Sequence, residues 1–152
     1  MNHYIIDGNN LIGRIKSLSQ LQIKDKQGSR EELVHLLNRY FAGKKIKLSL
    51  HFDGFQNLAL SVSKGKVYYS EKNSSDNLIR KEIDNSKNPK LIILVTSDRS
   101  LMNYGKVNSC TVISSDDFYK EVEKRFEKND EAEKIQQLEK EKDEFLRLFG
   151  SK

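Results

Sequence analysis

The stretch "KLIILVTSD", residues 90–98, carries the clearest strand signal of the chain and decides the fold class. Its run from Leu91 to Val95 is apolar on both faces, so neither face of the strand would meet water. Such a run is typical of a parallel sheet that helices cover on both sides. Pro89, the only proline, stands just before the run and separates it from the preceding helical pattern.

Strand and helix patterns alternate on both sides of this stretch. The other strands are expected at 3–7, 45–53, 66–70 and 110–114. The helices are expected at 29–44, at 74–86, at 99–105 with a stop at Gly105, and from 115 onwards. Residues 13–28, with two glycines and several lysines, are expected to form a long mobile loop. The alternation predicts an α/β domain with a mainly parallel sheet.

The charge is unevenly distributed along the 152 residues, whose formal net charge is +5. Residues 127–152 hold six basic and eight acidic residues, whereas the rest of the chain holds 21 basic and 14 acidic residues. A basic body of this kind fits a polyanionic partner such as nucleic acid, and a merely lysine-rich protein is the alternative. The charged tail has apolar residues at a broken heptad spacing, which predicts a helix that is either solvated or packed on a partner.

Other features of the sequence indicate the cellular compartment of the protein. Cys110 is the only cysteine, so an intrachain disulfide is excluded, as fits a reducing compartment. The N-terminus shows no secretory signal, and the apolar run Leu91 to Val95 is far too short to span a membrane. We therefore expect a soluble cytoplasmic protein with no membrane partner.

Aspartates stand where the expected strands end. Asp7, Asp53 and Asp98 each follow a strand, and Asp76 opens a helix directly after another strand. The carboxyl ends of parallel strands meet at one edge of a sheet, where ligands bind at the point of strand-order reversal. Each acid alone has a structural explanation in a turn or a helix start, but their convergence favours a ligand site. Asp7 and Asp98 should be the closest pair if their strands are neighbours.

Crowded carboxylates repel one another and need a compensating cation. Mg²⁺ prefers oxygen ligands and often combines a few carboxylates with waters and substrate phosphate. Asp7, Asp76 and Asp98 are the predicted ligands, and the Asn10 carboxamide would add an oxygen. A water activated by the ion could then attack the phosphorus of a phosphodiester.

Neighbouring residues have supporting roles in this hypothesis. Gly8 would let the backbone approach the phosphate closely, and Thr96 and Ser97 would hydrogen-bond the carboxylates or the phosphate. Other chemistries have weaker signals, because no Walker loop or dinucleotide fingerprint is present and the three histidines lack ligand spacing. Cys110, in an apolar strand, is expected to be a small buried residue.

Four short motifs in this order resemble the YacP-like branch of the NYN domain, a subgroup of the PIN-like nucleases. They are D-G-N-N at 7–10, F-D-G at 52–54, S-S-D-N at 74–77 and T-S-D at 96–98. The resemblance covers about residues 1–126 and implies a three-layer α/β/α PIN-like fold. It also implies an endoribonuclease that uses Mg²⁺ or Mn²⁺ to hydrolyse single-stranded RNA. The remaining residues, 127–152, form the predicted charged helical tail.

The resemblance assigns roles residue by residue. Asp7 and Asn10 match the first acidic motif, Asp76 matches the acid at the helix start, and Asp98 matches the acid after the fourth strand. Asp53 matches the aspartate of F-D-G and is expected to support the site rather than to act directly.

The chain departs from the branch at two positions. Asn9 stands where an aromatic residue is common, and Asn77 stands where many relatives have a second acid beside Asp76. The loss of that charge weakens a two-metal site more than a one-metal site.

Basic residues near strand ends and helix starts outline a path for RNA. Arg30 falls where the branch often has an arginine, and Lys64, Arg80 and Arg99 complete the predicted set. The RNA, whether mRNA, rRNA or tRNA, is not specified by the sequence. A basic body with an amphipathic tail would also suit docking on a large ribonucleoprotein such as the ribosome.

Two other function classes remain as alternatives. One is a non-catalytic RNA-binding or ribosome-associated module of the same fold, which the missing acid at Asn77 favours. The other is a phosphoacceptor signalling domain, since Asp7, Asp53 and Thr96 stand at comparable strand ends. That second alternative lacks the lysine expected after the last strand.

Overall fold

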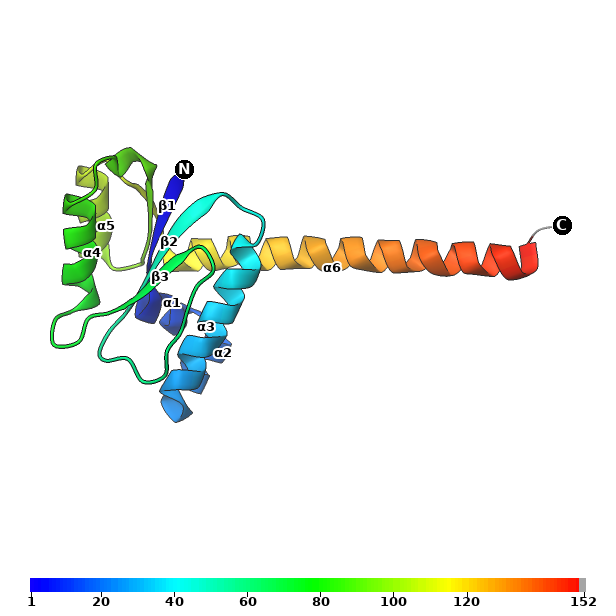
Figure 1. Cartoon of the computed structure of the whole chain (residues 1–152), viewed down its shortest axis with the longest axis horizontal. Helices are drawn as coiled ribbons and strands as arrows, with labels where there is room; N and C mark the ends of the chain where they lie inside the picture. Colours follow the sequence, from blue (N-terminus) through cyan, green and yellow to red (C-terminus); the bar gives the residue numbers. More distant parts are fainter. Residues whose placement is uncertain (151–152) are drawn as a thin grey trace. The chain divides into compact units, whose positions relative to one another are not determined.

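A single parallel sheet forms the centre of the first compact unit, Met1–Tyr119, of the computed structural model, which describes residues 1–150. Its strands run in the order β3-β2-β1-β4-β5, and each neighbouring pair is parallel (Figure 1). The strands are β1 Asn2–Asp7, β2 Ile46–Phe52, β3 Gly65–Tyr69, β4 Ile92–Val95 and β5 Thr111–Ile113. The predicted α/β fold with a parallel sheet is confirmed.

Helices cover both faces of this sheet, with α4 and α5 on one side and α1 to α3 on the other (Figure 1). The helices are α1 Gly8–Arg14, α2 Lys16–Lys24, α3 Lys26–Phe41, α4 Ser75–Asp84, α5 Arg99–Val107 and α6 Ser115–Phe145. A 3₁₀ turn, Pro89–Leu91, precedes β4, and a π turn, Leu146–Gly150, follows α6.

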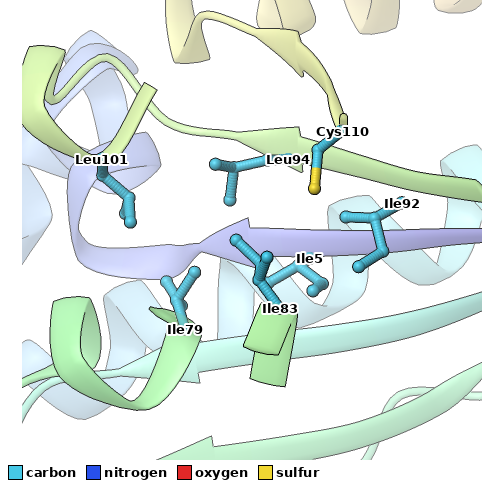
Figure 2. Packing of buried hydrophobic residues seen from close by; sticks show 7 residues of the cluster. All are labelled: Ile5, Ile79, Ile83, Ile92, Leu94, Leu101 and Cys110. Carbon is cyan, nitrogen blue, oxygen red and sulfur yellow. The ribbon is translucent and has the colours of Figure 1, made fainter. Parts of the chain in front are cut away.

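The core between the sheet and α4 and α5 is aliphatic. Its buried members are Ile5, Ile79, Ile83, Ile92, Leu94, Leu101 and Cys110 (Figure 2). On the other face, Tyr4 of β1 packs against the ring of Phe41, with the ring centroids 4.8 Å apart. Alternate residues of β1 therefore serve the two cores, as expected for a strand covered on both sides. Cys110 is a small buried residue, as predicted.

Residues 13–28 are helical, so the predicted mobile loop is wrong. Buried Ile15 and Leu18 anchor the start of α2. The Asp25 side chain then accepts a hydrogen bond from the Gly28 N–H and caps α3, which begins at Lys26. The polar composition of these short helices hid their few buried positions.

The predicted helix stop at Gly105 is also wrong, because α5 continues to Val107. A Cβ atom at Gly105 would lie 2.8 Å from Leu94 Cδ2 and 3.0 Å from Val112 Cγ2. This glycine therefore lets α5 pack closely on β4 and β5, and it does not end the helix.

The second unit begins at Lys120, within α6, and is helical as predicted. Val122 near its start is buried, whereas Ile135, Leu138, Phe145 and Phe149 further along are exposed. The division into residues 1–126 and 127–152 stays a prediction. Among residues 1–150, no helix is long and apolar enough to cross a membrane.

Candidate active site

The strand-terminal acids gather where the strand order reverses. The chain continues from β1 to β2 and β3 on one side of β1, and it then forms β4 and β5 on the other side. Ile6 of β1 pairs with Val95 of β4. Asp7 and Thr96 are therefore the next residues on these adjacent strands. This carboxyl edge is the place where open α/β sheets bind ligands. We call the set Asp7, Asp53, Asp76 and Asp98 the acid edge.

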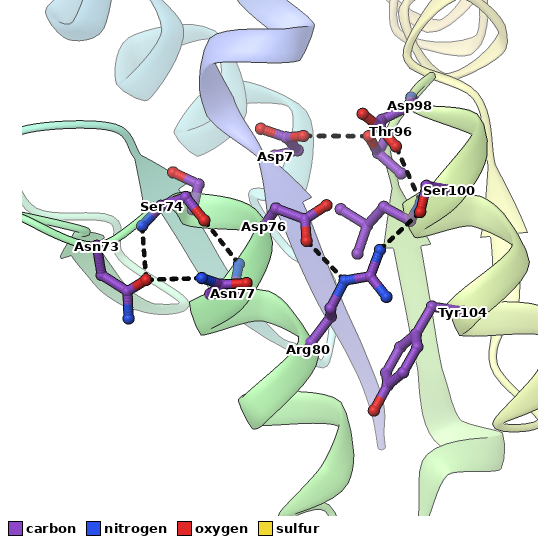
Figure 3. Close-up of polar contacts among 12 residues, drawn as sticks. Asp7, Asn73, Ser74, Asp76, Asn77, Arg80, Thr96, Asp98, Ser100 and Tyr104 are labelled. Carbon is purple, nitrogen blue, oxygen red and sulfur yellow. Dashed lines mark hydrogen bonds and ion pairs between the residues drawn. The ribbon is translucent and has the colours of Figure 1, made fainter.

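Asp7 lies at the centre of the acid edge in a partly buried position. Thr96 Oγ1 donates a hydrogen bond of 3.1 Å to Asp7 Oδ2 (Figure 3). Burial is the main reason that the pKa of Asp7 is raised to about 6, and the charges of Asp53 and Asp98 act in the same direction. The hydrogen bonds from Thr96 and from the backbone N–H of Asn10 oppose that rise. The charges of Asp53 and Asp98 have the same sign as that of ionised Asp7, so a bound cation would lower the free-energy cost of ionising Asp7.

Asp98 approaches the same position from the start of α5. Its Oδ1 accepts a hydrogen bond of 2.9 Å from the Leu101 N–H, which makes Asp98 the N-cap of this helix. Its own backbone N–H donates to Thr96 Oγ1 over 3.1 Å. Thr96 thus ties Asp7 to Asp98 through one hydroxyl group. The predicted hydrogen bond from Thr96 to a carboxylate is present, whereas the prediction that Asp7 and Asp98 are the closest pair of acids stays a prediction.

Asp76 has a different neighbour. Arg80, one turn later on α4, donates from Nε to Asp76 Oδ1 over 2.6 Å. Its Nη2 donates to Ser100 Oγ over 2.9 Å, and the guanidinium carbon lies 4.7 Å from the centre of the Tyr104 ring (Figure 3). Arg80, predicted as an RNA contact, is therefore engaged inside the acid edge.

Asp53 holds the loop after β2 in place, as its predicted supporting role requires. Its Oδ1 accepts from the Ser75 N–H over 2.9 Å at the start of α4. Its backbone N–H donates to Asn9 Oδ1 over 2.8 Å, and its carbonyl accepts from Arg30 Nη2 over 2.6 Å. Asn9, one of the departures from the family pattern, thus has a structural function here.

The Asn10 carboxamide joins three segments of the chain. Its Oδ1 accepts from the Ser97 N–H over 2.8 Å and from Ser115 Oγ over 2.7 Å, and the Ser115 N–H donates to Ser97 Oγ over 3.0 Å. That oxygen is already occupied, which disagrees with its predicted use as a metal ligand. Asn10 and Ser97 position the segment that carries Asp98. Buried Ser115 completes this clamp, and only its place at a helix start marked it in the sequence.

Gly8 is needed for packing rather than for a phosphate. A Cβ atom at Gly8 would lie 2.6 Å from the carbonyl oxygen of His51 and 2.8 Å from the ring of Phe52. The start of α1 therefore lies directly against β2, and the predicted approach to a ligand does not explain this glycine.

The remaining predicted RNA contacts separate in the structure. Arg30 is only 3% exposed and donates to the carbonyl oxygens of Asp53 and Phe55, which disagrees with a contact to RNA phosphate. Lys64 precedes β3, whose first residue pairs with Leu48 near the start of β2, so it lies at the opposite edge of the sheet. Arg99 is exposed at the first position of α5, beside Asp98.

Asn77, which replaces a second acid, belongs to a separate set of contacts. Its Nδ2 donates to Asn73 Oδ1 over 2.9 Å, and its backbone N–H donates to Ser74 Oγ over 3.1 Å (Figure 3). The side chain joins the N-terminal cap of α4 instead of the contacts around Asp7. An acid at this position would have to leave that cap to contribute to a metal site.

Comparison with known proteins agrees with this arrangement. Residues 4–148 match the family model described as the YacP-like NYN domain. The chain belongs to the YacP-like NYN family. The match extends beyond residue 126, the end of the resemblance expected from the sequence motifs, and includes most of the helical tail.

Solved structures support the same fold for this NYN protein. A crystal structure of Rae1 (YacP) from Bacillus subtilis is 21% identical, with a TM-score of 0.69 over 99% of this chain and 93% of that chain. Its W164L mutant is also 21% identical, with a TM-score of 0.74 over 90% of this chain and 85% of that chain. No curated protein sequence matches significantly. The fold is thus the nuclease-type fold of the NYN family.

The donor set of this NYN domain suits a hard divalent ion in its chemistry. Thr96 Oγ1 links the carboxylate of Asp7 to the backbone N–H of Asp98, and the like charges of Asp7 and Asp98 favour a cation near them. Within residues 1–150, however, no group of three or more His, Cys, Asp or Glu side chains is placed to hold a metal ion. The third predicted ligand, Asp76, is paired with Arg80 instead.

A second polar cluster lies under α4 and was not predicted as a unit. Glu82 of α4 accepts from Ser49 Oγ over 2.6 Å and lies 2.8 Å from His51 Nε2, and His3 Nε2 lies 2.8 Å from Ser49 Oγ. Burial acts to raise the pKa of Glu82, but the hydrogen bonds from His51 and Ser49 outweigh it and leave that pKa lowered. Burial lowers the pKa of His3. We call these four residues the histidine cluster.

Proposed function

We propose that this protein is a metal-dependent endoribonuclease that hydrolyses phosphodiester bonds of single-stranded RNA with Mg²⁺ or Mn²⁺. The single observation that supports the proposal best is the pair Asp7 and Asp98, held together by Thr96 at the reversal of strand order. The partly buried charge of Asp7, with the like charge of exposed Asp98 near it, costs stability, and a bound cation would offset that cost. Membership of the NYN family favours the same chemistry.

Each residue of the acid edge has a task in this proposal. Asp7 and Asp98 would hold the metal, and Asp76 would join them as the third carboxylate. The metal, when bound, supplies a Lewis acid for the phosphate and lowers the pKa of water. Thr96 fixes the orientation of Asp7 through its hydroxyl group, and Asn10 holds the segment before Asp98 through the Ser97 N–H. The protein thereby aligns its oxygen donors before substrate arrives.

The RNA would be held by cations near the acid edge. Arg99 is exposed beside Asp98 and is placed to meet a phosphate of the backbone. Arg30 supports the Asp53 loop from inside and Lys64 lies at the other edge, so neither belongs to this contact. The sequence does not specify the class of RNA, and docking on the ribosome stays a prediction from charge.

The test is a cleavage assay with purified protein and several end-labelled single-stranded RNAs, with Mn²⁺, with Mg²⁺ and with EDTA. An Asp98→Asn variant should lose cleavage, because asparagine retains the helix cap but removes the carboxylate charge. Asp143→Asn, which removes an equal charge from the exposed tail, is the matched control and should cleave normally. Cleavage that persists in EDTA and in Asp98→Asn would refute the proposal.

A non-catalytic RNA-binding module is the second candidate. The observation that favours it is that the described residues hold no ready group of three metal-binding side chains, since Asp76 is paired with Arg80. In that case all the RNAs would bind without cleavage under every metal condition. Asp98→Asn would then leave RNA affinity unchanged or raise it, because a negative charge near the phosphates is lost.

A further inference from the structure

Arg80 joins α4 to α5 within the acid edge. It contacts Asp76 on its own helix, Ser100 at the start of α5 and the ring face of Tyr104 one turn further along α5 (Figure 3). The Tyr104 hydroxyl group in turn donates to Asp84 on α4. The guanidinium is therefore held by a hydroxyl, a carboxylate and an aromatic ring at once. An arginine of this kind has a defined place in the fold, unlike a solvated surface arginine.

The carboxylate of Asp76, the third predicted metal ligand, forms an ion pair with Arg80. The Arg80 Nε atom lies 2.6 Å from Asp76 Oδ1, and the two side chains are 28% and 38% exposed. The negative charge of Asp98 also acts on Arg80, so the guanidinium stands near two of the three acids predicted as ligands. One positive charge of the chain therefore compensates this side of the acid edge.

We propose that Arg80 is the built-in counter-ion of the acid edge, which holds Asp76 in the metal-free protein and competes with the divalent cation for it. This inference rests on the proposed function, because it concerns the same site. Asp76 can complete the set with Asp7 and Asp98 only when its ion pair with Arg80 opens. Arg80 is thus a positioning residue whose release precedes full loading of the site.

The competition has a thermodynamic consequence. A site whose third ligand is free for only a fraction of the time binds with an apparent affinity reduced by that fraction. Removal of Arg80 should therefore strengthen metal binding, whereas removal of an ordinary stabilising arginine would leave it unchanged or weaken it. The expected gain in metal affinity requires the carboxylate of Asp76. This requirement distinguishes competition for Asp76 from the general effect of losing one positive charge.

The experiment measures Mn²⁺ affinity directly, from the electron paramagnetic resonance signal of free Mn²⁺, without RNA. Arg80→Gln should bind Mn²⁺ about tenfold more tightly than the native chain, which corresponds to about 1.4 kcal/mol. Arg99→Gln is the matched control, since it removes an equal charge beside Asp98 from an exposed position. It should change the affinity about twofold or less, because exposed charges are screened by solvent and salt.

Two further variants make the test specific. In an Asp76→Asn background, Arg80→Gln should give no gain beyond that of Arg99→Gln, because the contested carboxylate is absent. Arg80→Lys keeps the charge but lacks the fork that reaches Asp76 and Ser100 together, so its gain should be smaller than that of Arg80→Gln. If circular dichroism shows that Arg80→Gln is unfolded, the comparison rests on Arg80→Lys, which should still bind more tightly than the native chain.

The outcomes distinguish the two proposals. Equal affinities for Arg80→Gln and Arg99→Gln, with clear Mn²⁺ binding by the native chain, would overturn the competition and leave the nuclease proposal intact. A gain from Arg80→Gln that persists in the Asp76→Asn background would also overturn the competition. Absence of Mn²⁺ binding from every folded variant would refute the nuclease proposal, and this inference with it.

Discussion

The acid edge and the histidine cluster lie on the same face of the sheet, and α4 contributes a carboxylate to each. Glu82 in the histidine cluster meets a serine hydroxyl and histidine nitrogens, and its pKa is lowered. Asp7 in the acid edge is partly buried and lies near the like charges of Asp53 and Asp98, and burial above all raises its pKa to about 6. In the first cluster the carboxylate of Glu82 has its hydrogen-bond partners within the chain, although His51 Nδ1 has none, and we expect the cluster to stabilise the fold. In the acid edge, ionisation of Asp7 costs free energy that a bound cation would offset, and such perturbed groups are typical of functional sites.

The largest effect should come from the acid edge and concern activity. Asp7→Asn should lower the rate of RNA cleavage at least a thousandfold, because loss of a metal ligand removes several kcal/mol of charge stabilisation. Single-turnover cleavage of end-labelled RNA measures this rate. Glu82→Gln is a control carboxylate change outside the acid edge and should retain cleavage. Normal cleavage by Asp7→Asn would place the reaction elsewhere.

The histidine cluster should show the reverse pattern, a loss of stability. Glu82→Ala leaves His51 and Ser49 without their acceptor in a mostly buried place. We expect it to lower the free energy of unfolding by about 2–3 kcal/mol. Urea denaturation measures this value, with Glu32→Ala on the exposed face of α3 as the matched control. A change no larger than that of the control would show that the cluster adds little to stability.

Asp7→Asn should stabilise the metal-free protein while it removes activity. The pKa of Asp7 is raised from 3.8 to about 6 by folding, so the folded state binds this proton more tightly than the unfolded state. The resulting stability is fully present below pH 3.8 and is lost as the pH rises through 6. The neutral variant avoids that loss, and we expect a gain of about 1–2 kcal/mol at pH 8 after allowance for partial exposure.

Denaturation with urea in EDTA at pH 5 and pH 8 measures the gain. It should be larger at pH 8, where the native carboxylate is ionised. A gain that is equal at both values, or absent at pH 8, would mean that the charge on Asp7 carries no cost in the folded chain.

Much of this comparison could be predicted from the sequence, because the strand signals locate the strand ends. Asp7 and Asp98 follow strong apolar runs, which places both at the carboxyl edge of the sheet, whereas the adjacency of their strands came from the structure. Asp76 and Arg80 are four residues apart on α4, a spacing that allows an ion pair on one helix face, but from the sequence we interpret Arg80 only as an RNA contact. These features depend on local order along the chain.

Other features depend on contacts between distant segments, which no local pattern encodes. Asn10 meets Ser115 across more than a hundred residues, and its oxygen is thereby removed from the predicted ligand set. The position of Lys64 could be judged only after the register of β3 against β2 showed which end of the strand it precedes. Burial of Arg30 likewise follows from the path of residues 53–55 over α3.

The smallest expected effect concerns the histidine cluster and is a change in how stability depends on pH. Burial lowers the pKa of His3 below 6.5, so its contribution to stability is present above that pH and is lost as the pH falls through the lowered value. Asp7 has the opposite sign, since its contribution is lost as the pH rises. His3→Gln should therefore flatten the acid side of the stability profile in EDTA and leave the alkaline side unchanged. If the stability of His3→Gln still falls with the same slope at low pH, His3 is not the group that destabilises the fold there. The two clusters would then differ only in their charge at neutral pH.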